Sequence, residues 1–318
     1  MLIVQKFGGS SLADTGKLAI AAQRTAEAYG AGHRIVTVVS AQGDTTDALL
    51  RRAHAVAPAP GDRELDALLS VGELVSAALL AMELEKQGLP AVSLSGWQMG
   101  LHTDGCHGNA HILKIDAARL RRELEQGRIV VAAGFQGVDV AGDVTTLGRG
   151  GSDTTAVALA AALDAARCRI YTDVDGIYTA DPRLLPEAKK LDAVAWEEML
   201  ALAERGSQVL HDRCVALALE RRVSLELLSA GGPGPGTLVG RAAPLPYTGV
   251  TRRGGDVSLV GAALREDPEV PRRMRAALAR RGIPASAPVP GNGGLSLTVT
   301  VPEAAATEAV RALHAAFF

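Results

Sequence analysis

The chain has 318 residues, of which 47% are hydrophobic and 21% charged, so it can bury a sizeable core and is not an intrinsically disordered chain. Its 33 Lys and Arg residues nearly balance its 35 Asp and Glu residues, which gives a formal net charge of −2. This balance excludes an overall field that would recruit nucleic acid or a membrane surface, and it favours small-molecule ligands.

The cysteine content and the N-terminal residues indicate the cellular compartment of the protein. The three cysteines are widely spaced and odd in number, which is typical of a reducing compartment. The apolar run at residues 1–6 is too short for a signal peptide and predicts a first strand. No run is expected to span a membrane, and we therefore expect a cytoplasmic protein.

The first part of the chain alternates short apolar runs with helical patterns. Residues 2–6 predict a strand that breaks at Gly8-Gly9-Ser10-Ser11, before a helix over 15–29. The unbroken β-branched run at 35–39 predicts a strand buried on both faces, followed by a polar loop at 40–46. Further elements are predicted as a helix over 64–87, strands over 91–94 and 129–135, a polar loop over 102–110, a helix over 119–125 and a hairpin over 138–144.

A glycine-rich stretch at residues 147–155 follows the hairpin and runs into an alanine-rich helical segment. Its three glycines allow the backbone to approach an anion, and Ser152 or Asp153 could cap the helix that follows. The helix N-terminus adds partial positive charge, and Arg149 adds a planar fork suited to carboxylate or phosphate. By itself the pattern also fits an ordinary tight turn between a strand and a helix.

The second part of the chain continues the alternation and then changes character. Strands are predicted over 170–174 and 223–228, and helices over 196–205 and 209–220. A stretch dense in glycine and proline at 230–237 ends this pattern. Beyond it we expect a small α+β module with strands over 249–252, 257–260, 284–288 and 295–301 and helices over 271–281 and 304–315.

A metal site is the competing interpretation for one polar loop. Ligand-capable side chains crowd it at His102, Asp104, Cys106, His107 and His111. Their spacing matches no standard zinc pattern, so we predict no metal site. Cys168 and Cys214 are expected to be small core residues, because no histidine and acid accompany them as in a nucleophilic site.

Paired motifs then point to a family. The stretches Lys6-Phe7-Gly8-Gly9-Ser10-Ser11 and Leu147-Gly148-Arg149-Gly150-Gly151-Ser152-Asp153 together resemble the signature of aspartate kinases in the amino-acid kinase superfamily. The resemblance covers residues 1 to about 228 and includes the loops at 40–46, 107–110, 134–137 and 171–183. It implies a three-layer αβα sandwich with a mostly parallel sheet over 1–230, a linker over 231–247 and one ACT-like domain over 248–318.

The resemblance also implies a reaction, the transfer of the γ-phosphoryl group of ATP, accompanied by Mg²⁺, to the side-chain carboxylate of L-aspartate. Lys6 would neutralise the transferring group, and Asp153 would orient Lys6 and the substrate amine. A solvated strand end is the alternative for Lys6. The implied substrate residues are Thr45, Glu73, Arg149 and Ser152, although Glu73 could instead be a solvent-facing helix charge. The implied nucleotide residues are Gly8, Gly9, Ser10, Thr172, Asp173, Tyr178, Arg183 and Gln208.

Two departures from the family pattern open alternatives. Gln208 stands where the family carries a lysine, and Leu74 stands where it carries an arginine. The chain could therefore be a weakened homologue that acts as a binding or regulatory subunit, or a kinase of a different carboxylate. Family members usually carry two ACT modules, so a single one predicts weak or absent inhibition by lysine and threonine. Its open sheet edge predicts a homodimer.

Overall fold

The computed structural model describes residues 1–232 and 234–318, which divide into two compact units. The first unit consists of Met1–Asp175 and Glu220–Gly234, and the second of Gly176–Leu219 and Pro235–Phe318. This division differs from the predicted domains, because side chains of residues 180–188 share a hydrophobic core with the C-terminal sheet. The predicted boundaries at 230 and 247 stay a prediction.

A parallel sheet forms the centre of the first unit. Its strands lie in the order β13 (Leu225–Ser229), β9 (Arg167–Thr172), β1 (Leu2–Phe7), β2 (Arg34–Val39), β6 (Ile129–Ala133) and β3 (Ala91–Leu94). Every residue of β1 and all but the first residue of β2 are buried. For β2 this is what the unbroken β-branched run at 35–39 predicted.

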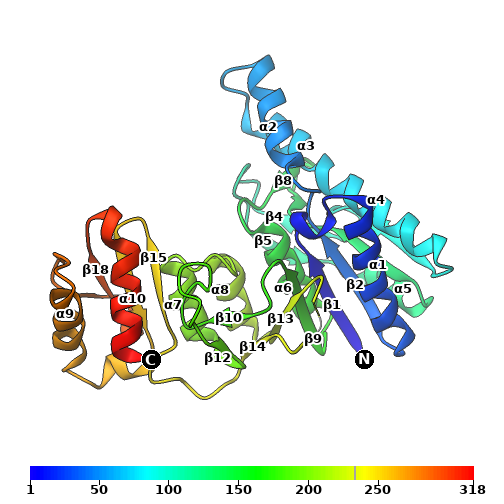
Figure 1. Ribbon diagram of the computed structural model, residues 1–318. Helices are drawn as coiled ribbons and strands as arrows, with labels where there is room; N and C mark the ends of the chain where they lie inside the picture. The colour runs from blue at the N-terminus through cyan, green and yellow to red at the C-terminus, as the bar shows by residue number, and fades with distance from the viewer. Residues whose placement is uncertain (233) are drawn as a thin grey trace. The chain divides into compact units, whose positions relative to one another are not determined.

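Helices cover both faces of this sheet (Figure 1). On one face α1 (Thr15–Gly30) and α4 (Val71–Lys86) share a core with the side chains of Ile3, Phe7 and Ile35. On the other face lies α6 (Gly151–Ala162), which contacts β1, β2 and β9. The expected three-layer αβα arrangement with a mostly parallel sheet is thereby confirmed.

The pairing register brings several loops together at one edge of the sheet. Phe7 pairs with Val39 on one side and Tyr171 on the other, and Val39 also pairs with Ala133. The residues that follow these strands therefore meet at the carboxyl edge, where open α/β sheets bind ligands. The loops beginning at Gly8, Ser40 and Gly134 are thus neighbours although they are distant in sequence.

A second, smaller sheet completes the first unit. Its order is β5 (Ile112–Ile115), β4 (Leu101–Thr103), β7 (Gln136–Val138) and β8 (Val144–Thr146). Strands β7 and β8 are antiparallel, and their turn is closed by the Asp139 N–H donating to the Asp143 carbonyl at 3.0 Å. The predicted hairpin is confirmed. Helix α5 (Ala118–Glu125) lies against β6.

The helix expected over 64–87 is two helices, α3 (Asp62–Leu69) and α4, which meet at Ser70. At the junction, the Ser70 carbonyl accepts a hydrogen bond from Gln136 Nε2 at 2.8 Å, and the Ser70 hydroxyl donates to the Ala67 carbonyl. These bonds compete with the regular helical ladder. A further helix, α2 (Thr45–Val56), occupies chain to which sequence reasoning assigned no element.

We expected no run long and apolar enough to span a membrane, and this was wrong, because one run meets both criteria. The stretch Asp62–Lys86 is long and apolar enough, with a mean hydropathy of 1.7 over 18 residues. Half of that window is buried, and α4 packs on β3 and β6, so it is a core helix of this unit. Length and composition cannot distinguish the two cases.

The second unit contains one hairpin, one parallel strand pair and an antiparallel sheet. The hairpin joins β10 (Ile177–Tyr178) to β11 (Lys190–Leu191), and β12 (Ala193–Ala195) pairs with β14 (Thr237–Gly240). Helices α7 (Trp196–Glu204) and α8 (Asp212–Arg221) follow β12. Strand β14 lies inside the linker expected over 231–247, so that stretch is not uniformly irregular. Pro233, in the same stretch, lies outside the described residues.

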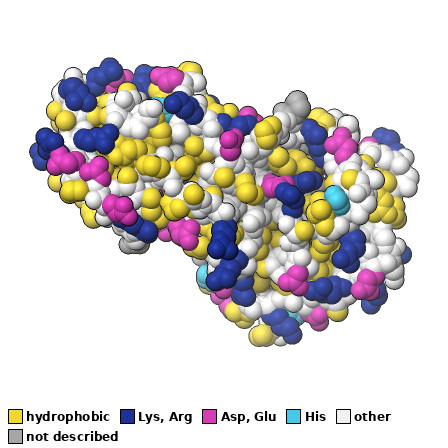
Figure 2. Space-filling model, turned by 90° about the horizontal axis from the view of Figure 1, so that it is seen from below, with side chains coloured by type: hydrophobic (Ala, Val, Ile, Leu, Met, Phe, Trp, Pro, Cys, Tyr) yellow, Lys and Arg dark blue, Asp and Glu magenta, His cyan; other side chains and the backbone are white. Residues whose placement is uncertain are grey.

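The antiparallel sheet has the order β15 (Gly249–Arg253), β16 (Asp256–Val260), β18 (Ser296–Thr300) and β17 (Val289–Pro290). Helices α9 (Val270–Arg280) and α10 (Ala306–Phe317) share its core. The strand expected over 284–288 was wrong, since the paired residues are Val289 and Pro290. Pro284 and Pro288 have no N–H to donate, and between them the Ser286 N–H donates to the Thr300 carbonyl at 2.9 Å without forming a strand. On the face in Figure 2, basic and acidic side chains are interspersed, in keeping with the balanced composition.

Candidate functional site

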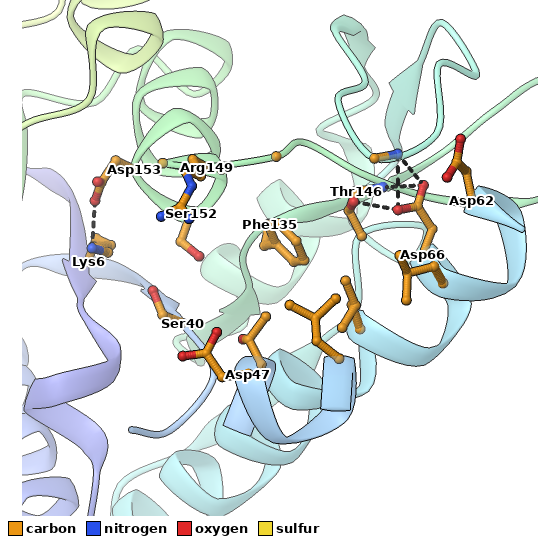
Figure 3. A pocket seen from close by; sticks show the side chains of 18 residues that line it. Lys6, Ser40, Asp47, Asp62, Asp66, Phe135, Thr146, Arg149, Ser152 and Asp153 are labelled. Carbon is orange, nitrogen blue, oxygen red and sulfur yellow. Dashed lines mark hydrogen bonds and ion pairs between the residues drawn. The ribbon is translucent and has the colours of Figure 1, made fainter. Parts of the chain in front are cut away.

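A cavity of about 510 Å³ opens at the carboxyl edge of the parallel sheet in the first unit. Cationic side chains, Lys6 and Arg149, lie at one end, and Asp62 and Asp66 lie at the other (Figure 3). The complete lining is Lys6, Ser40, Thr46, Asp47, Leu50, Asp62, Leu65, Asp66, Leu69, Gly108, Phe135, Thr146, Gly148, Arg149, Gly150, Gly151, Ser152 and Asp153. Of the two motifs that the resemblance paired, the second lines the cavity from Gly148 to Asp153, whereas the first contributes only Lys6. Gly8, Gly9 and Ser10 lie outside the lining, and their part in phosphate binding stays a prediction.

Lys6 and Asp153 form an ion pair inside this cavity, with Lys6 Nζ 2.6 Å from Asp153 Oδ1. Their side chains are only 11% and 15% exposed, so solvent screens the pair less than a surface pair. Lys6 is the penultimate residue of β1, and Asp153 lies in the first turn of α6. The alternative of a solvated strand end for Lys6 is therefore wrong, because the side chain is buried and paired.

The glycine-rich stretch forms the N-terminus of α6. Gly148 and Gly150 have φ of 73° and 71°, the left-handed region that glycine adopts without a steric penalty. Gly150 itself is the N-cap and no side chain caps the helix, so the expectation that Ser152 or Asp153 would cap it was wrong. Both residues lie within the first turn, and Asp153 is engaged by Lys6. The helix N-terminus points partial positive charge at the cavity.

Arg149 projects from this loop as an exposed guanidinium. Across residues 1–232 and 234–318 it has no ion-pair partner, so its planar fork is free to receive an anion. Ser152, in the next turn, packs against the end of β6, where a Cβ on Gly134 would lie 2.8 Å from Ser152 Cβ. Gly134 therefore permits the close approach that sets α6 against the sheet.

Phe135 is a cavity residue that sequence reasoning missed as an individual side chain. Its φ is 69°, which is uncommon for a residue with a bulky side chain. Its N–H donates to Thr155 Oγ1 at 3.2 Å, and a Cβ on Gly151 would lie 2.8 Å from its ring. No sequence signal marks this conformation, because contacts with α6 impose it.

The loop after β1 approaches the loop after β2 closely. A Cβ on Gly9 would lie 2.5 Å from the Ala41 carbonyl oxygen, so only glycine fits at this position. The Gly43 N–H donates to the Gly9 carbonyl at 3.0 Å. A Cβ on Gly8 would lie 3.5 Å from Lys6 Nζ, which places this backbone beside the ammonium group. The arrangement suits a phosphate that would contact both.

Glu73 is buried beneath the loop after β2, with 4% exposure, so the alternative of a solvent-facing helix charge is wrong. Its Oε1 accepts a hydrogen bond from the Ala41 N–H at 2.9 Å, while Oε2 has no partner among the described atoms. Burial raises the pKa of the Glu73 carboxyl to about 7. Glu73 does not line the cavity, and its role toward a substrate stays a prediction.

Thr45 is placed at the first position of α2, with its hydroxyl donating to the Gln42 carbonyl at 2.6 Å. The next two residues, Thr46 and Asp47, line the cavity in its place. Sequence reasoning missed them because it did not recognise α2, whose helical geometry decides which side chains of this segment face inward.

The expected nucleotide residues divide between the units. Thr172 is the last residue of β9 in the first unit and Asp173 follows it, and the Thr172 hydroxyl donates to Asp173 Oδ1. Tyr178, Arg183 and Gln208 belong to the second unit. There the Arg183 guanidinium lies 2.8 Å from Asp181 and holds the pKa of that carboxyl below its usual value. Their part in nucleotide binding stays a prediction.

The histidine-rich loop is organised by carboxylates. His111 Nδ1 lies 2.8 Å from Asp104 Oδ2, and His107 Nδ1 lies 2.9 Å from Asp66 Oδ2. No group of three or more potential metal ligands occurs among the residues that the structure describes. Cys168 and Cys214 are buried, and burial raises the pKa of the Cys168 thiol far above its usual range, as expected of core residues.

Comparison with known proteins identifies the family of this chain. The family model for the amino acid kinase family matches residues 1–228, and an ACT domain model matches 257–317. An aspartokinase of Thermus thermophilus is 44% identical over 323 residues, which covers 98% of this chain and 79% of that relative. The chain belongs to the aspartokinases of the amino acid kinase family.

Other aspartokinases match over different extents. The aspartokinase of Mycolicibacterium smegmatis is 54% identical over 239 residues, covering 75% of this chain. That alignment spans only 57% of the relative's own length. The crystal structure of E. coli aspartokinase III with aspartate and ADP superposes with a TM-score of 0.89 over 100% of both chains. At 23% identity this last likeness shows that the aspartokinase fold is shared.

Proposed function

We propose that this chain is an aspartate kinase, which transfers the γ-phosphoryl group of ATP to the side-chain carboxylate of L-aspartate to give 4-phospho-L-aspartate. The observation that carries the proposal is the buried Lys6–Asp153 ion pair beside the unpaired Arg149 guanidinium in one cavity. Membership of the aspartokinases supports the choice of substrate. E. coli aspartokinase III, which shares the fold, was solved with aspartate and ADP.

Arg149 binds the α-carboxylate of aspartate in this proposal. Its guanidinium fork matches a carboxylate in a bidentate way, and the N-terminus of α6 adds N–H donors and partial positive charge. Ser152 and Thr45 supply hydroxyl groups, and ionised Glu73 attracts the substrate ammonium. Together these groups hold the side-chain carboxylate toward Lys6, and such positioning is the main source of rate in phosphoryl transfer.

Lys6 neutralises charge on the transferring phosphoryl group, and Asp153 holds the ammonium of Lys6 in place at 2.6 Å. The backbone N–H groups of Gly8, Gly9 and Ser10 face the phosphates from the opposite loop. On the nucleotide side we assign Thr172, Asp173, Tyr178, Arg183 and Gln208. Mg²⁺ would be held chiefly by phosphate oxygens and water, and it would supply charge neutralisation.

The test uses purified protein with MgATP, L-aspartate and hydroxylamine. Acyl phosphates react with hydroxylamine, so an aspartate kinase yields aspartyl hydroxamate together with aspartate-dependent ADP. Absence of both products contradicts the proposal. A panel of amino and dicarboxylic acids tests the alternative that another carboxylate is the acceptor, and that alternative requires a clear preference for the other acid.

A second candidate is a weakened homologue that binds ligands as a regulatory subunit. It is favoured by Gln208, which replaces a cationic family residue and is exposed in the loop between α7 and α8. Leu74 does not add to this case, because it lies on the outer side of α4, away from the cavity lining. This candidate requires nucleotide or aspartate binding without turnover, so robust turnover by the unmodified protein excludes it.

We also infer a cytoplasmic homodimer that binds neither nucleic acid nor membranes. The ACT-like sheet has β15 and β17 at its two edges, and a second copy could pair with either of them. Size-exclusion chromatography coupled to light scattering measures the mass of the protein in solution. A mass equal to one chain, 32.9 kDa, at micromolar concentration contradicts the dimer.

A further inference from the structure

Asp66 lies on α3 with only 1% of its side chain exposed, at the end of the cavity opposite Lys6 (Figure 3). Both of its carboxylate oxygens are occupied by donors from other segments. Oδ1 accepts from the Gly108 N–H at 3.1 Å and from the Thr146 hydroxyl. Oδ2 accepts from the Thr146 N–H at 3.0 Å and lies 2.9 Å from His107 Nδ1. We call Asp66, His107, Gly108 and Thr146 the Asp66 network.

The Asp66 network fixes the start of the loop that carries Arg149. Thr146 is the last residue of β8, and the loop begins at the next residue, Leu147. Its N–H and hydroxyl are held by Asp66, and its carbonyl accepts from the Ala110 N–H at 2.9 Å. The next N–H, of Leu147, donates to the Phe135 carbonyl at 2.8 Å. The three polar groups of Thr146 and the N–H of Leu147 therefore each have a partner that fixes their direction.

A buried carboxylate is a costly way to hold two segments together, unless all of its lone pairs are used. Within the described part of the chain, no lysine or arginine forms an ion pair with Asp66. Its partners are backbone N–H groups, a hydroxyl and a histidine ring, all of which belong to cavity walls or their neighbours. The Asp66 carboxylate therefore holds two cavity-lining segments in place. Both of its oxygens already accept hydrogen bonds from the protein, so we do not assign it a substrate.

We propose that Asp66 is a positioning residue, which sets the place of Arg149 by fixing Thr146 and the His107–Gly108 loop. The proposal rests on the proposed aspartate kinase activity, because it assigns to Arg149 the binding of the acceptor's carboxylate. A displaced Arg149 lowers the occupancy of the acceptor site but leaves nucleotide binding intact. The signature is therefore a selective rise in the KM for aspartate.

The principal test is Asp66→Asn, which keeps the size of the side chain but turns one oxygen into an N–H₂ group facing N–H donors. We expect the KM for aspartate to rise by about tenfold or more, with the KM for ATP within about twofold. Thr146→Val removes only the hydroxyl bond and should raise the KM for aspartate by about threefold. This variant replaces Asp66→Asn as the test if Asp66→Asn does not fold.

The matched control is Glu123→Gln on α5. Glu123 is also a buried carboxylate, 3% exposed, and it pairs with Arg119 and Arg128 outside the cavity lining. We expect this variant to lose stability while both KM values stay unchanged. Equal rises of the KM for aspartate in Glu123→Gln and Asp66→Asn would mean that Asp66 has only a structural role, which overturns the proposal.

A readout independent of turnover separates this proposal from the proposed function. Amide hydrogen exchange at residues 147–151 should be at least about tenfold faster in folded Asp66→Asn than in the unmodified protein, and unchanged in Glu123→Gln. Unchanged exchange in Asp66→Asn overturns the positioning role even if the unmodified protein is active. If the unmodified protein lacks aspartate-dependent turnover, the proposed function fails, and the exchange measurement still decides whether Asp66 fixes the loop.

Discussion

Glu73 and Ala41 are joined by a single hydrogen bond, in which the Ala41 N–H donates to Glu73 Oε1 at 2.9 Å and leaves Oε2 without a partner among the described atoms. This carboxyl is buried in the first unit, and burial raises its pKa from 4.5 to about 7. Below pH 7 the protonated form is therefore favoured in the folded protein, and a cation beside this carboxyl would favour the ionised form.

This shift predicts a stability that falls as pH rises. Because the folded pKa lies above the unfolded value, the folded state binds more protons between pH 4.5 and 7. The contribution is complete below pH 4.5 and is lost as pH rises through 7, a change of about 3 kcal/mol at 1.4 kcal/mol per pKa unit. Glu73→Gln should remove this dependence and raise the melting temperature at pH 8, which thermal unfolding from pH 5 to 8 measures. A wild-type profile parallel to that of the variant would count against the shift.

Replacing Lys6 by methionine should abolish most turnover. The substitution keeps the length of the side chain but removes the ammonium that pairs with Asp153. We expect kcat to fall by about 10²-fold or more, since one electrostatic donor to a developing charge contributes that much. Steady-state kinetics with a folded variant checks this, and an unchanged kcat would show that Lys6 does not act on the transferring group.

Gly134→Ala should disturb the seating of α6 against the sheet. The added Cβ would lie 2.8 Å from Ser152 Cβ and Oγ, so the helix start has to move. We expect a loss of about 1–3 kcal/mol in the free energy of unfolding, as for overpacking elsewhere. Gly30→Ala is the matched control, because a Cβ there meets nothing within 4 Å. Urea unfolding of both variants measures the difference, and equal effects would contradict the close packing.

Restoring a cation at position 208 should raise turnover. Gln208 is exposed, so Gln208→Lys adds a charge without a burial cost. If the nucleotide phosphates lie near this position, kcat should rise by about tenfold or more. Gln126→Lys, at the exposed end of α5, adds the same charge elsewhere and should leave kcat unchanged. Identical kcat values for the wild type and Gln208→Lys would remove Gln208 from the nucleotide site.

Inhibition by lysine or threonine should be weak or absent in the 318-residue polypeptide. The family model for an ACT domain matches one stretch, residues 257–317, whereas effector sites between paired modules need two. The measurement is aspartate-dependent ADP formation with each amino acid added up to millimolar concentration. Strong inhibition by either at micromolar concentration would place an effector site on this single module or between two copies of the chain.

The sequence by itself determined that 35–39 is a strand buried on both faces, because an unbroken β-branched run is typical of such a strand. The mostly parallel sheet followed from the resemblance to a family. The resemblance of two motifs to the aspartate kinase signature paired Lys6 with the stretch 148–153, and the cavity brings them together, although Gly8, Gly9 and Ser10 do not line it. Lys6, Arg149, Ser152 and Asp153 were named from these motifs, and all four line the cavity.

Only the tertiary structure decided how the remaining groups contribute. Glu73 is buried rather than exposed, and its carboxylate accepts a hydrogen bond from Ala41, which is distant in sequence. The helix expected over 64–87 is divided at Ser70, where the carbonyl accepts a hydrogen bond from the distant Gln136 side chain. Asp66 became part of the site through bonds to Gly108 and Thr146. Periodicity reports the local partition of apolar side chains, whereas these outcomes depend on hydrogen bonds between segments that meet only after folding.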